Sequence, residues 1–257
     1  GEAVAQSSLE IGAGLIAGSI FVRRQTTMRS TRPLIAIDLF KNPTFALATV
    51  TSTATYTAQG LAYVSLPYFF QSALDRTPFE SGLLLSPWPI AVAVVAPIAG
   101  RLSDRYPAGV LSTIGLAILA LGLGLYAALP EHPTLTQIVV HGMICGVGFG
   151  FFQSPNNREI VGSAPRAKAG SASGILACVR LTGQTLGAAF VGIVFGAATG
   201  AAIGGSDHAA GIVRVATPVA LWIGCACAAL AMVASGFRLL TARRRGGVEA
   251  VGAATNR

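Results

Sequence analysis

The sequence predicts an all-α protein that crosses a lipid bilayer several times, and its composition and hydropathy pattern support that prediction. Hydrophobic residues make up 53% of the 257 residues, charged residues make up 11%, and the mean hydropathy is +0.64. Soluble domains carry about 25% charged residues. Uncharged segments, most of them at least as long as the roughly 20 residues that a helix needs to cross a bilayer, recur at 42–74, 81–100, 106–130, 132–157, 181–206 and 215–237. None has the wide polar stripe that a helix of a soluble bundle presents to water.

Seven transmembrane spans are predicted, at residues 3–22, 44–68, 80–100, 110–129, 134–154, 171–199 and 213–240. We expect an accessory helix at 1–25, a cytoplasmic linker at 26–43 with an amphipathic interfacial segment, a six-helix bundle at 44–240 and a basic cytoplasmic tail at 241–257. The accessory helix contains Glu10, for which a packing or interfacial role is favoured over titration. Because the chain begins with Gly1 rather than Met, we expect it to be a fragment.

Polar residues inside the second span predict a surface that lines a cavity. Tyr56, Gln59 and Tyr63 follow one another at three- and four-residue spacing, which places them on one face of a helix. The alternative is that they are interfacial aromatic residues and one hydrogen-bonded amide. In the third span, Pro87 and Pro97 remove backbone hydrogen bonds and predict kinks.

Arg180 is a charged residue near the middle of the sixth span. A charge at mid-membrane costs about 2.5–3.5 kcal/mol on insertion scales, so Arg180 is expected to face the bundle interior or water. Gln184 and Gly187 share its helical face, and Gly183 leaves room for a neighbouring helix. Arg180 therefore either cross-links helices through backbone carbonyls or takes part in a substrate or proton path.

Other notable residues of the spans are expected to have packing roles. The closely spaced Gly146, Gly148 and Gly150 lack the preceding strand of a dinucleotide-binding loop, so close helix packing explains them. His141 is more simply an interfacial histidine than a proton relay. The four cysteines all lie in apolar segments, where they are expected to pack rather than to form disulfides or bind a metal.

The basic residues predict the orientation of the spans. If the loop at 101–105 is cytoplasmic and the spans alternate, fifteen of the eighteen Lys and Arg residues lie inside, Arg76 and Arg214 lie outside, and Arg180 lies in the membrane. This is the positive-inside bias of membrane proteins. Because the basic residues lie in loops rather than in one patch, the net charge of +8 does not indicate nucleic-acid binding.

Several motifs resemble those of a known family. The sequence Gly100-Arg101-Leu102-Ser103-Asp104-Arg105 resembles the loop motif of the major facilitator superfamily. The glycines at 146–150, Pro155-Asn156, Gly170-x-x-x-Gly174 and Arg180-x-x-Gly183-Gln184-x-x-Gly187 are similar to the drug:proton antiporters with fourteen spanning helices. The resemblance covers nearly the whole chain, which would be the eighth to fourteenth spans: one accessory helix and the six-helix C-terminal bundle. The uncharged segment 106–110 departs from the family loop, which usually continues with Gly and basic residues.

The resemblance implies the C-terminal part of a proton-coupled efflux transporter for small amphipathic or cationic compounds, in which two bundles rock around a central site. The expected substrate cavity consists of Tyr56, Gln59, Tyr63, Arg180 and Gln184. The expected gating loop consists of Gly100, Arg101, Asp104 and Arg105, with Asp104 paired to its neighbouring arginines or to a helix end. The alternative for these charges is that they only fix the topology. The expected packing and kink positions are Pro87, Pro97, Gly146, Gly150, Gly174, Gly183 and Gly187.

The expected partners are a bacterial plasma membrane, a small-molecule substrate and the N-terminal half of the same transporter, which would contain the acidic proton site. The proton gradient would supply the energy, with no cofactor or metal. Three alternatives stay open: a metabolite transporter, a non-transporting sensor, and a half-transporter that pairs with a second chain. A membrane enzyme is disfavoured because its active site would place several His, Asp or Glu residues at one depth.

Overall fold

The structure is a computed structural model that describes residues 37–201 and 208–255, together with residues 16, 19, 20 and 23. Most of the predicted first span, including Glu10, and most of the predicted linker lie outside the described residues.

The described part of the chain is helical and contains no strand. Its elements are η1 (Ile37–Lys41), α2 (Pro43–Tyr68), the π-helical turn η2 (Phe69–Ala73), α3 (Pro78–Leu85), α4 (Pro87–Leu102), α5 (Ala108–Ala127), α6 (Leu135–Gly162), η3 (Arg166–Lys168), α7 (Ala169–Ala201) and α8 (His208–Thr255). Three helices begin at capping side chains, which satisfy backbone N–H groups that have no partner within the helix. Asn42 caps α2, while Thr77 and Thr134 form capping boxes with Glu80 and Gln137.

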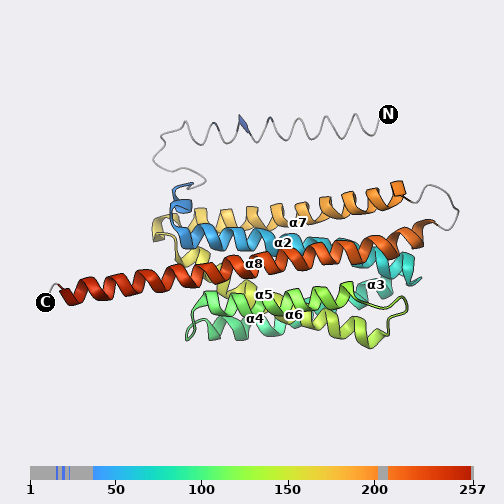
Figure 1. Cartoon of the computed structure of the whole chain (residues 1–257), viewed down its shortest axis with the longest axis horizontal. Coiled ribbons are helices and arrows are strands. Elements are labelled where there is room, and N and C mark those ends of the chain that lie inside the picture. Colours follow the sequence, from blue (N-terminus) through green and yellow to red (C-terminus); the bar gives the residue numbers. More distant parts are fainter. Residues whose placement is uncertain (1–15, 17–18, 21–22, 24–36, 202–207, 256–257) are drawn as a thin grey trace.

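The long helices pack side by side in the order α7, α2, α8, α5, α6, α4, as Figure 1 shows. This order is symmetric about its centre. The helix α2 of the first group (α2 to α5) packs between α7 and α8, and in the same way α6 of the second group (α6 to α8) packs between α4 and α5. Such internal repeats are common in membrane transporters.

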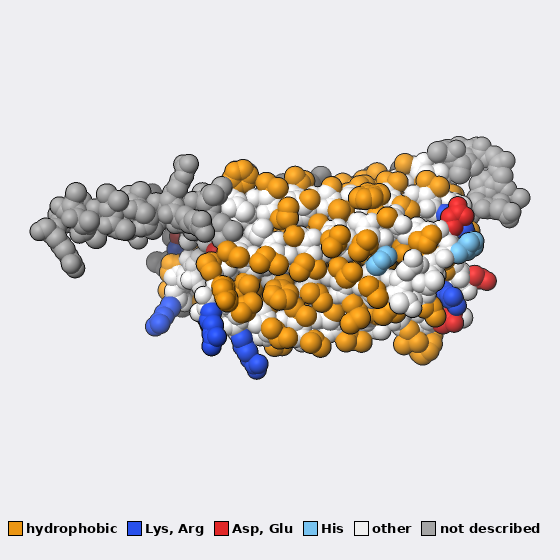
Figure 2. All heavy atoms as spheres, turned by 60° about the horizontal axis from the view of Figure 1, so that its bottom comes forward, with side chains coloured by type: hydrophobic (Ala, Val, Ile, Leu, Met, Phe, Trp, Pro, Cys, Tyr) orange, Lys and Arg blue, Asp and Glu red, His pale blue; other side chains and the backbone are white. Residues whose placement is uncertain are grey.

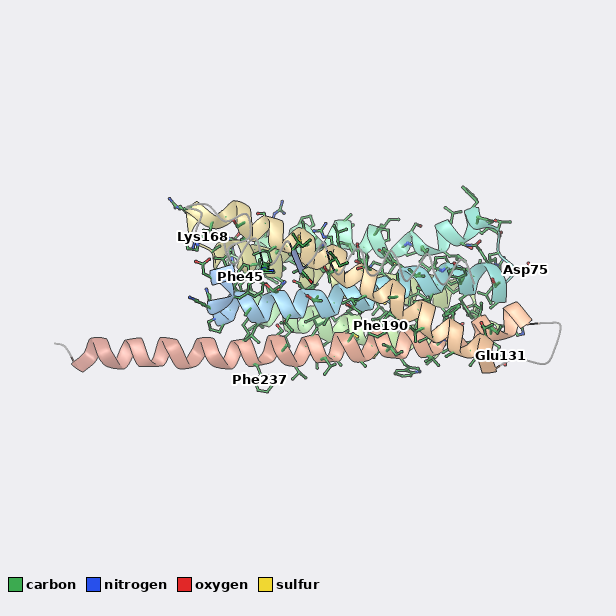
Figure 3. The ribbon with its side chains drawn as sticks, turned by 90° about the horizontal axis from the view of Figure 1, so that it is seen from above. Phe45, Asp75, Glu131, Lys168, Phe190 and Phe237 are labelled. Carbon is green, nitrogen blue, oxygen red and sulfur yellow. The ribbon has the colours of Figure 1, made fainter. Side chains whose placement is uncertain are left out.

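The outer surface of the bundle has an apolar middle and charged ends. Figure 2 shows hydrophobic side chains covering the middle of one face, with charged side chains at both ends: Lys and Arg at one end, and Asp and Glu together with further Lys or Arg at the other. Figure 3 places Lys168 at one end of the bundle and Asp75 and Glu131 at the other. We call the first of these the basic end. The described basic residues at this end, outside the C-terminal part of α8, are Lys41, Arg101, Arg105, Arg158, Arg166, Lys168 and Arg238.

Five of the helical segments are long and apolar enough to cross a membrane: Pro78–Leu102, Ala108–Ala127, Leu135–Gly162, Arg166–Thr199 and Ala210–Arg238. The helix α2 has 26 residues but is not among them, because many of its residues are Thr or Ser. Its position explains this composition. It lies between α7 and α8, and 15 of its residues are buried. Several hydroxyls, such as those of Thr55 and Ser65, donate to the carbonyl oxygen four residues earlier, both at 2.7 Å.

One of the predicted span ends is wrong. The fifth span was expected to end at residue 154, yet α6 continues through the buried Pro155 to Gly162. The seventh span was expected at 213–240, which agrees with the apolar segment Ala210–Arg238, and the helix α8 itself continues to Thr255. A proline inside a membrane helix is tolerated where neighbouring helices surround it. The two prolines of the third span have different effects. Pro87 begins α4, directly after α3 has ended at Leu85, whereas Pro97 lies inside a continuous α4.

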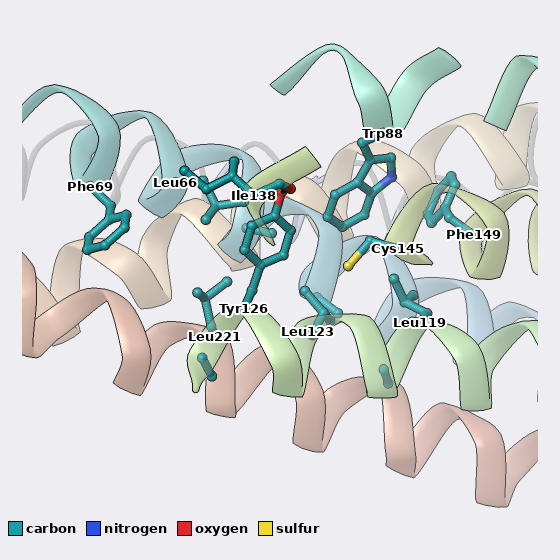
Figure 4. Close-up of a cluster of buried hydrophobic side chains, with 14 of the residues drawn as sticks. Leu66, Phe69, Trp88, Leu119, Leu123, Tyr126, Ile138, Cys145, Phe149 and Leu221 are labelled. Atoms are coloured by element: carbon teal, nitrogen blue, oxygen red, sulfur yellow. Dashed lines mark hydrogen bonds between the residues drawn. The ribbon is translucent and has the colours of Figure 1, made fainter. Parts of the chain in front are cut away.

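The main hydrophobic core joins the helices at the middle of the bundle and is rich in large side chains (Figure 4). Trp88, Tyr126 and Phe149 pack there with several leucines, and each is at most 3% exposed. The Tyr126 hydroxyl donates to the carbonyl oxygen of Ile138 at 2.7 Å, so this phenol is buried without leaving its polar atom unpaired.

Glycines let neighbouring helices approach closely at several points. A Cβ atom at Gly146 would collide with the carbonyl oxygen of Trp88 and would lie 2.7 Å from the Cβ of Ala91. Gly150, Gly183 and Gly187 also lie at tight helix contacts. Gly174 makes no such contact among the described residues, where a Cβ atom would meet nothing within 4 Å, so the packing role expected for it stays a prediction.

A buried polar network joins four helices towards the basic end. Arg238 on α8 is 2% exposed, and its guanidinium contacts Asn156 Oδ1 at 3.0 Å and Glu159 Oε2 at 3.1 Å, both on α6. The Asn156 amide donates to Ser52 Oγ on α2 at 2.7 Å. Ser235, one turn before Arg238, accepts a hydrogen bond from a threonine of α5 at 3.0 Å. We call these residues the Arg238 network.

The glycine contacts generate a first prediction. Alanine favours helix over glycine by about 1 kcal/mol, so Gly174→Ala should leave stability unchanged or raise it slightly. Gly146→Ala adds the same methyl group against backbone and should lower stability by about 1–3 kcal/mol. Apparent melting temperatures of the two variants in detergent measure the difference, and equal shifts would contradict the assigned contact.

The Arg238 network generates a second prediction. Removing one partner of a buried ion pair leaves the other charge uncompensated and typically costs about 3–5 kcal/mol. Arg238→Met and Glu159→Met should therefore each destabilise the protein, and the double variant should recover part of the loss. A double-mutant cycle on melting temperatures measures the coupling, and strictly additive effects would rule out the pair.

Candidate functional site

Polar and aromatic side chains gather midway along α2, α6 and α7. Tyr56 on α2 is 1% exposed, and its ring packs edge-on against Phe149 of α6 with centroids 5.7 Å apart. Its hydroxyl oxygen accepts a hydrogen bond from Gln153 Nε2 of α6 at 3.4 Å. Cζ of Arg180, on α7, lies 5.5 Å from the centre of the same Tyr56 ring. Tyr56 therefore links α6 to the arginine of α7.

Two glutamines join α2 to α7 one turn further along. Gln184 Nε2 donates to Gln59 Oε1 at 3.3 Å, and both side chains are at least partly shielded from solvent. The helices can approach this closely because Gly60 and Gly183 face the opposite helix, where any Cβ atom would come within 2.7 Å of its neighbours. The glycines thus position the polar pair.

Tyr63 extends the group towards α4. Its ring packs edge-on against Trp88 with centroids 5.2 Å apart, and 38% of the residue is exposed. The five residues that the sequence assigned to a cavity therefore lie along the contact between α2 and its neighbours. We call them, with Gln153, the polar face: Tyr56, Gln59, Tyr63, Gln153, Arg180 and Gln184.

The sequence prediction missed Gln153, Phe149 and Trp88. Gln153 was placed at the end of a span that in the structure continues for two more turns. An uncharged amide inside an otherwise apolar segment was the available signal. Trp88 follows the proline at which α4 begins, and nothing in its spacing links it to Tyr63 on another helix.

The loop between α4 and α5 makes an ion pair that differs from the expected one. Asp104 pairs with Arg158 on α6 rather than with Arg101 or Arg105. Arg158 also donates to Ser103 Oγ at 3.1 Å, and Gly100 lies against Ser154 of the same helix. The reason is that α6 is longer than predicted, so its last turns reach this loop. Both charged side chains are more than half exposed.

A second ion pair at the same end joins Asp38 of η1 to Lys168 of η3. The hydrogen bond from Lys168 lowers the pKa of the Asp38 carboxyl group, which keeps this carboxylate charged in mildly acidic solution. The loops before α2 and α7 are thereby linked at their exposed ends.

No three His, Cys, Asp or Glu side chains of the described residues are arranged as they would be around a metal ion. His141 is half-buried and packs edge-on against Tyr126, with ring centres 5.5 Å apart. It therefore lies at the α5–α6 contact rather than on the polar face.

Comparisons with known proteins agree with this architecture. The model of the Major Facilitator Superfamily matches residues 11–188 and, in an overlapping match, residues 48–255. The chain is 44% identical over 194 residues to the uncharacterized transporter YebQ of Escherichia coli strain K12, an alignment that covers 76% of this chain and 42% of that protein.

Two further relatives have names that state a substrate or a phenotype. The chain is 33% identical over 169 residues to multidrug resistance protein Stp of Mycobacterium tuberculosis, covering 66% of this chain and 31% of Stp. It is 31% identical over 161 residues to riboflavin transporter RibZ of Clostridioides difficile, covering 63% of this chain and 35% of RibZ. In each case the alignment covers less than half of the relative. With a family model that matches most of its length and two groups of helices that pack alike, this chain belongs to the major facilitator superfamily of multi-pass membrane transporters.

Proposed function

We propose that this chain forms the C-terminal bundle of a proton-coupled efflux transporter for small amphipathic molecules in a bacterial plasma membrane. A second bundle would complete the transporter, and the two would rock against each other around a site at mid-depth. The name of the relative Stp, a multidrug resistance protein, supports the efflux assignment.

The polar face is the observation that carries the proposal. A charged or amide side chain at the middle of a spanning helix is costly in lipid, so such residues usually face a bundle interior or a water-filled path. Arg180 lies 11 residues after the start of α7 and is exposed, with Gln184 on the next turn. A substrate path along this face accounts for both positions.

The Asp104–Arg158 pair would act as a gate at the basic end. An ion pair between exposed side chains contributes about 0–1 kcal/mol, so it adds little to stability. It can still favour one of two bundle arrangements that differ by a few kcal/mol. Closing the basic end would form the pair and opening it would break the pair, if the rest of the transporter competes for either charge.

The proton gradient is the proposed source of energy. Moving one charge across the membrane releases about 2.3 kcal/mol per 100 mV. In the described spanning segments, the carboxylates are Glu80 in a helix cap and Glu159 in the Arg238 network. The proton-carrying acid is therefore proposed to belong to the second bundle.

A transporter for a metabolite is the second candidate. The relative RibZ is named a riboflavin transporter. The Gln59–Gln184 amide pair presents donors and acceptors side by side, as recognition of a ring that carries carbonyl and N–H groups requires.

Efflux in cells tests the main proposal. Cells that express the full-length transporter should accumulate less ethidium, fluorescein or riboflavin than cells without it, and an uncoupler of the proton gradient should abolish the difference. Accumulation that is identical with and without the transporter for all three compounds would refute an efflux function. Efflux that persists with the uncoupler would refute proton coupling.

Exchange of the gate charges tests the second step. Asp104→Asn should slow transport several-fold while the melting temperature changes little, because the pair is exposed. Asp104→Arg combined with Arg158→Asp should recover transport relative to either single change. Arg105→Gln is the matched control, because Arg105 is exposed and is not the partner of Asp104. Unchanged transport by Asp104→Asn would remove the gate assignment.

A further inference from the structure

Arg180, near the middle of α7, differs from Arg158, Arg214 and Arg238 in what its N–H groups contact. Arg214 donates to the carbonyl oxygen of Ala73 at 3.0 Å, Arg158 to Asp104, and Arg238 to Asn156. The contact of Arg180 within the described residues is the face of Tyr56, and no oxygen among them accepts a hydrogen bond from it. A guanidinium has five N–H donors, so Arg180 is free to bind an acceptor that the described residues do not supply.

The charge balance around Arg180 favours an anion as that acceptor. Glu80 and Glu159 are the carboxylates of the described spanning segments, and both lie near helix ends and are engaged by other groups. Arg180 is thus the one ionised side chain at mid-depth in the described segments. In a site of low dielectric constant, an uncompensated cation attracts anions and repels cations strongly.

The residues beside Arg180 indicate the rest of the ligand. Gln184, one turn along the same helix, adds an amide. Tyr63 is seven residues beyond Tyr56 on the same face of α2, a rise of about 10 Å at 1.5 Å per residue, and the residue is partly exposed. The polar face therefore presents a cation, an amide and aromatic surfaces in succession.

From this arrangement we infer that the polar face selects an organic anion with a planar aromatic body. Its carboxylate or equivalent group binds the Arg180 guanidinium, which suits the two oxygens of a carboxylate. Its ring lies towards Tyr63. This inference rests on the proposed transport function and names its substrate class, which differs from the cationic compounds that the family resemblance implies. Arg180 is the residue that sets this preference.

Binding of three compounds with one ring system tests the inference. The compounds are 2-naphthoate, 2-naphthamide and 2-naphthylmethylammonium, which are anionic, neutral and cationic. The purified full-length transporter should bind 2-naphthoate most tightly and the ammonium compound most weakly. Arg180→Gln should weaken 2-naphthoate binding about tenfold or more, as loss of a charged hydrogen bond predicts, and should change 2-naphthamide binding less than threefold.

Two further variants complete the test. Arg180→Lys keeps the charge and should retain the order of preference, whereas Arg166→Gln makes the same charge change at an exposed position of η3 and should alter nothing. A preference of the unmodified protein for the ammonium compound overturns the inference, and this result requires no folded variant. If Arg180→Gln weakens all three compounds equally, Arg180 instead pairs with a carboxylate of the second bundle. Because the cellular efflux assay is separate, a transporter that exports ethidium alone would refute this inference and leave the transport function standing.

Discussion

The bundle depends on one buried cation. Arg238 is almost fully withdrawn from solvent, and it holds Glu159 and Asn156 of α6, while Asn156 reaches Ser52 of α2. An ion pair at this depth adds little net stability compared with apolar packing, but a shifted helix would leave each charge unpaired. The network therefore fixes how far α8 and α6 slide along each other and along α2. The same register brings Arg158, the residue before Glu159, to Asp104 at the surface.

Close helix contacts set the second constraint, and they serve the polar face directly. Gly183 lies against the Cβ of Tyr56, so α7 approaches α2 at the level where Arg180 lies over the Tyr56 ring. The contact between α4 and α6 is equally tight at Gly146, which lies against Trp88, the neighbour of Tyr63. The close approach of the helices at these glycines thus determines which polar side chains meet, although glycine itself contributes no side chain.

Much of this arrangement could be predicted from the sequence, because membrane helices are recognisable by their length and hydropathy. Arg180 and its neighbours on α2 were identifiable for the same reason, since a polar group in an apolar segment is conspicuous. The pairings were not predictable. From the sequence, Arg238 is expected to be a basic residue at a helix end, and Asp104 is expected to pair with one of the two arginines near it. In the structure both residues have partners on α6. The last turns of α6 follow Pro155, the residue at which a sequence-based prediction ends this helix.

The helix α2 has a consequence for how this protein is made. Its hydroxyls are satisfied by its own backbone, but its composition is too polar for a span that stands alone in lipid. The helices that cover it, α7 and α8, are encoded more than a hundred residues later and leave the ribosome after it. During synthesis α2 is therefore made before the helices that cover it, and we expect its stable insertion into the membrane to be completed only after α7 and α8 have been translated.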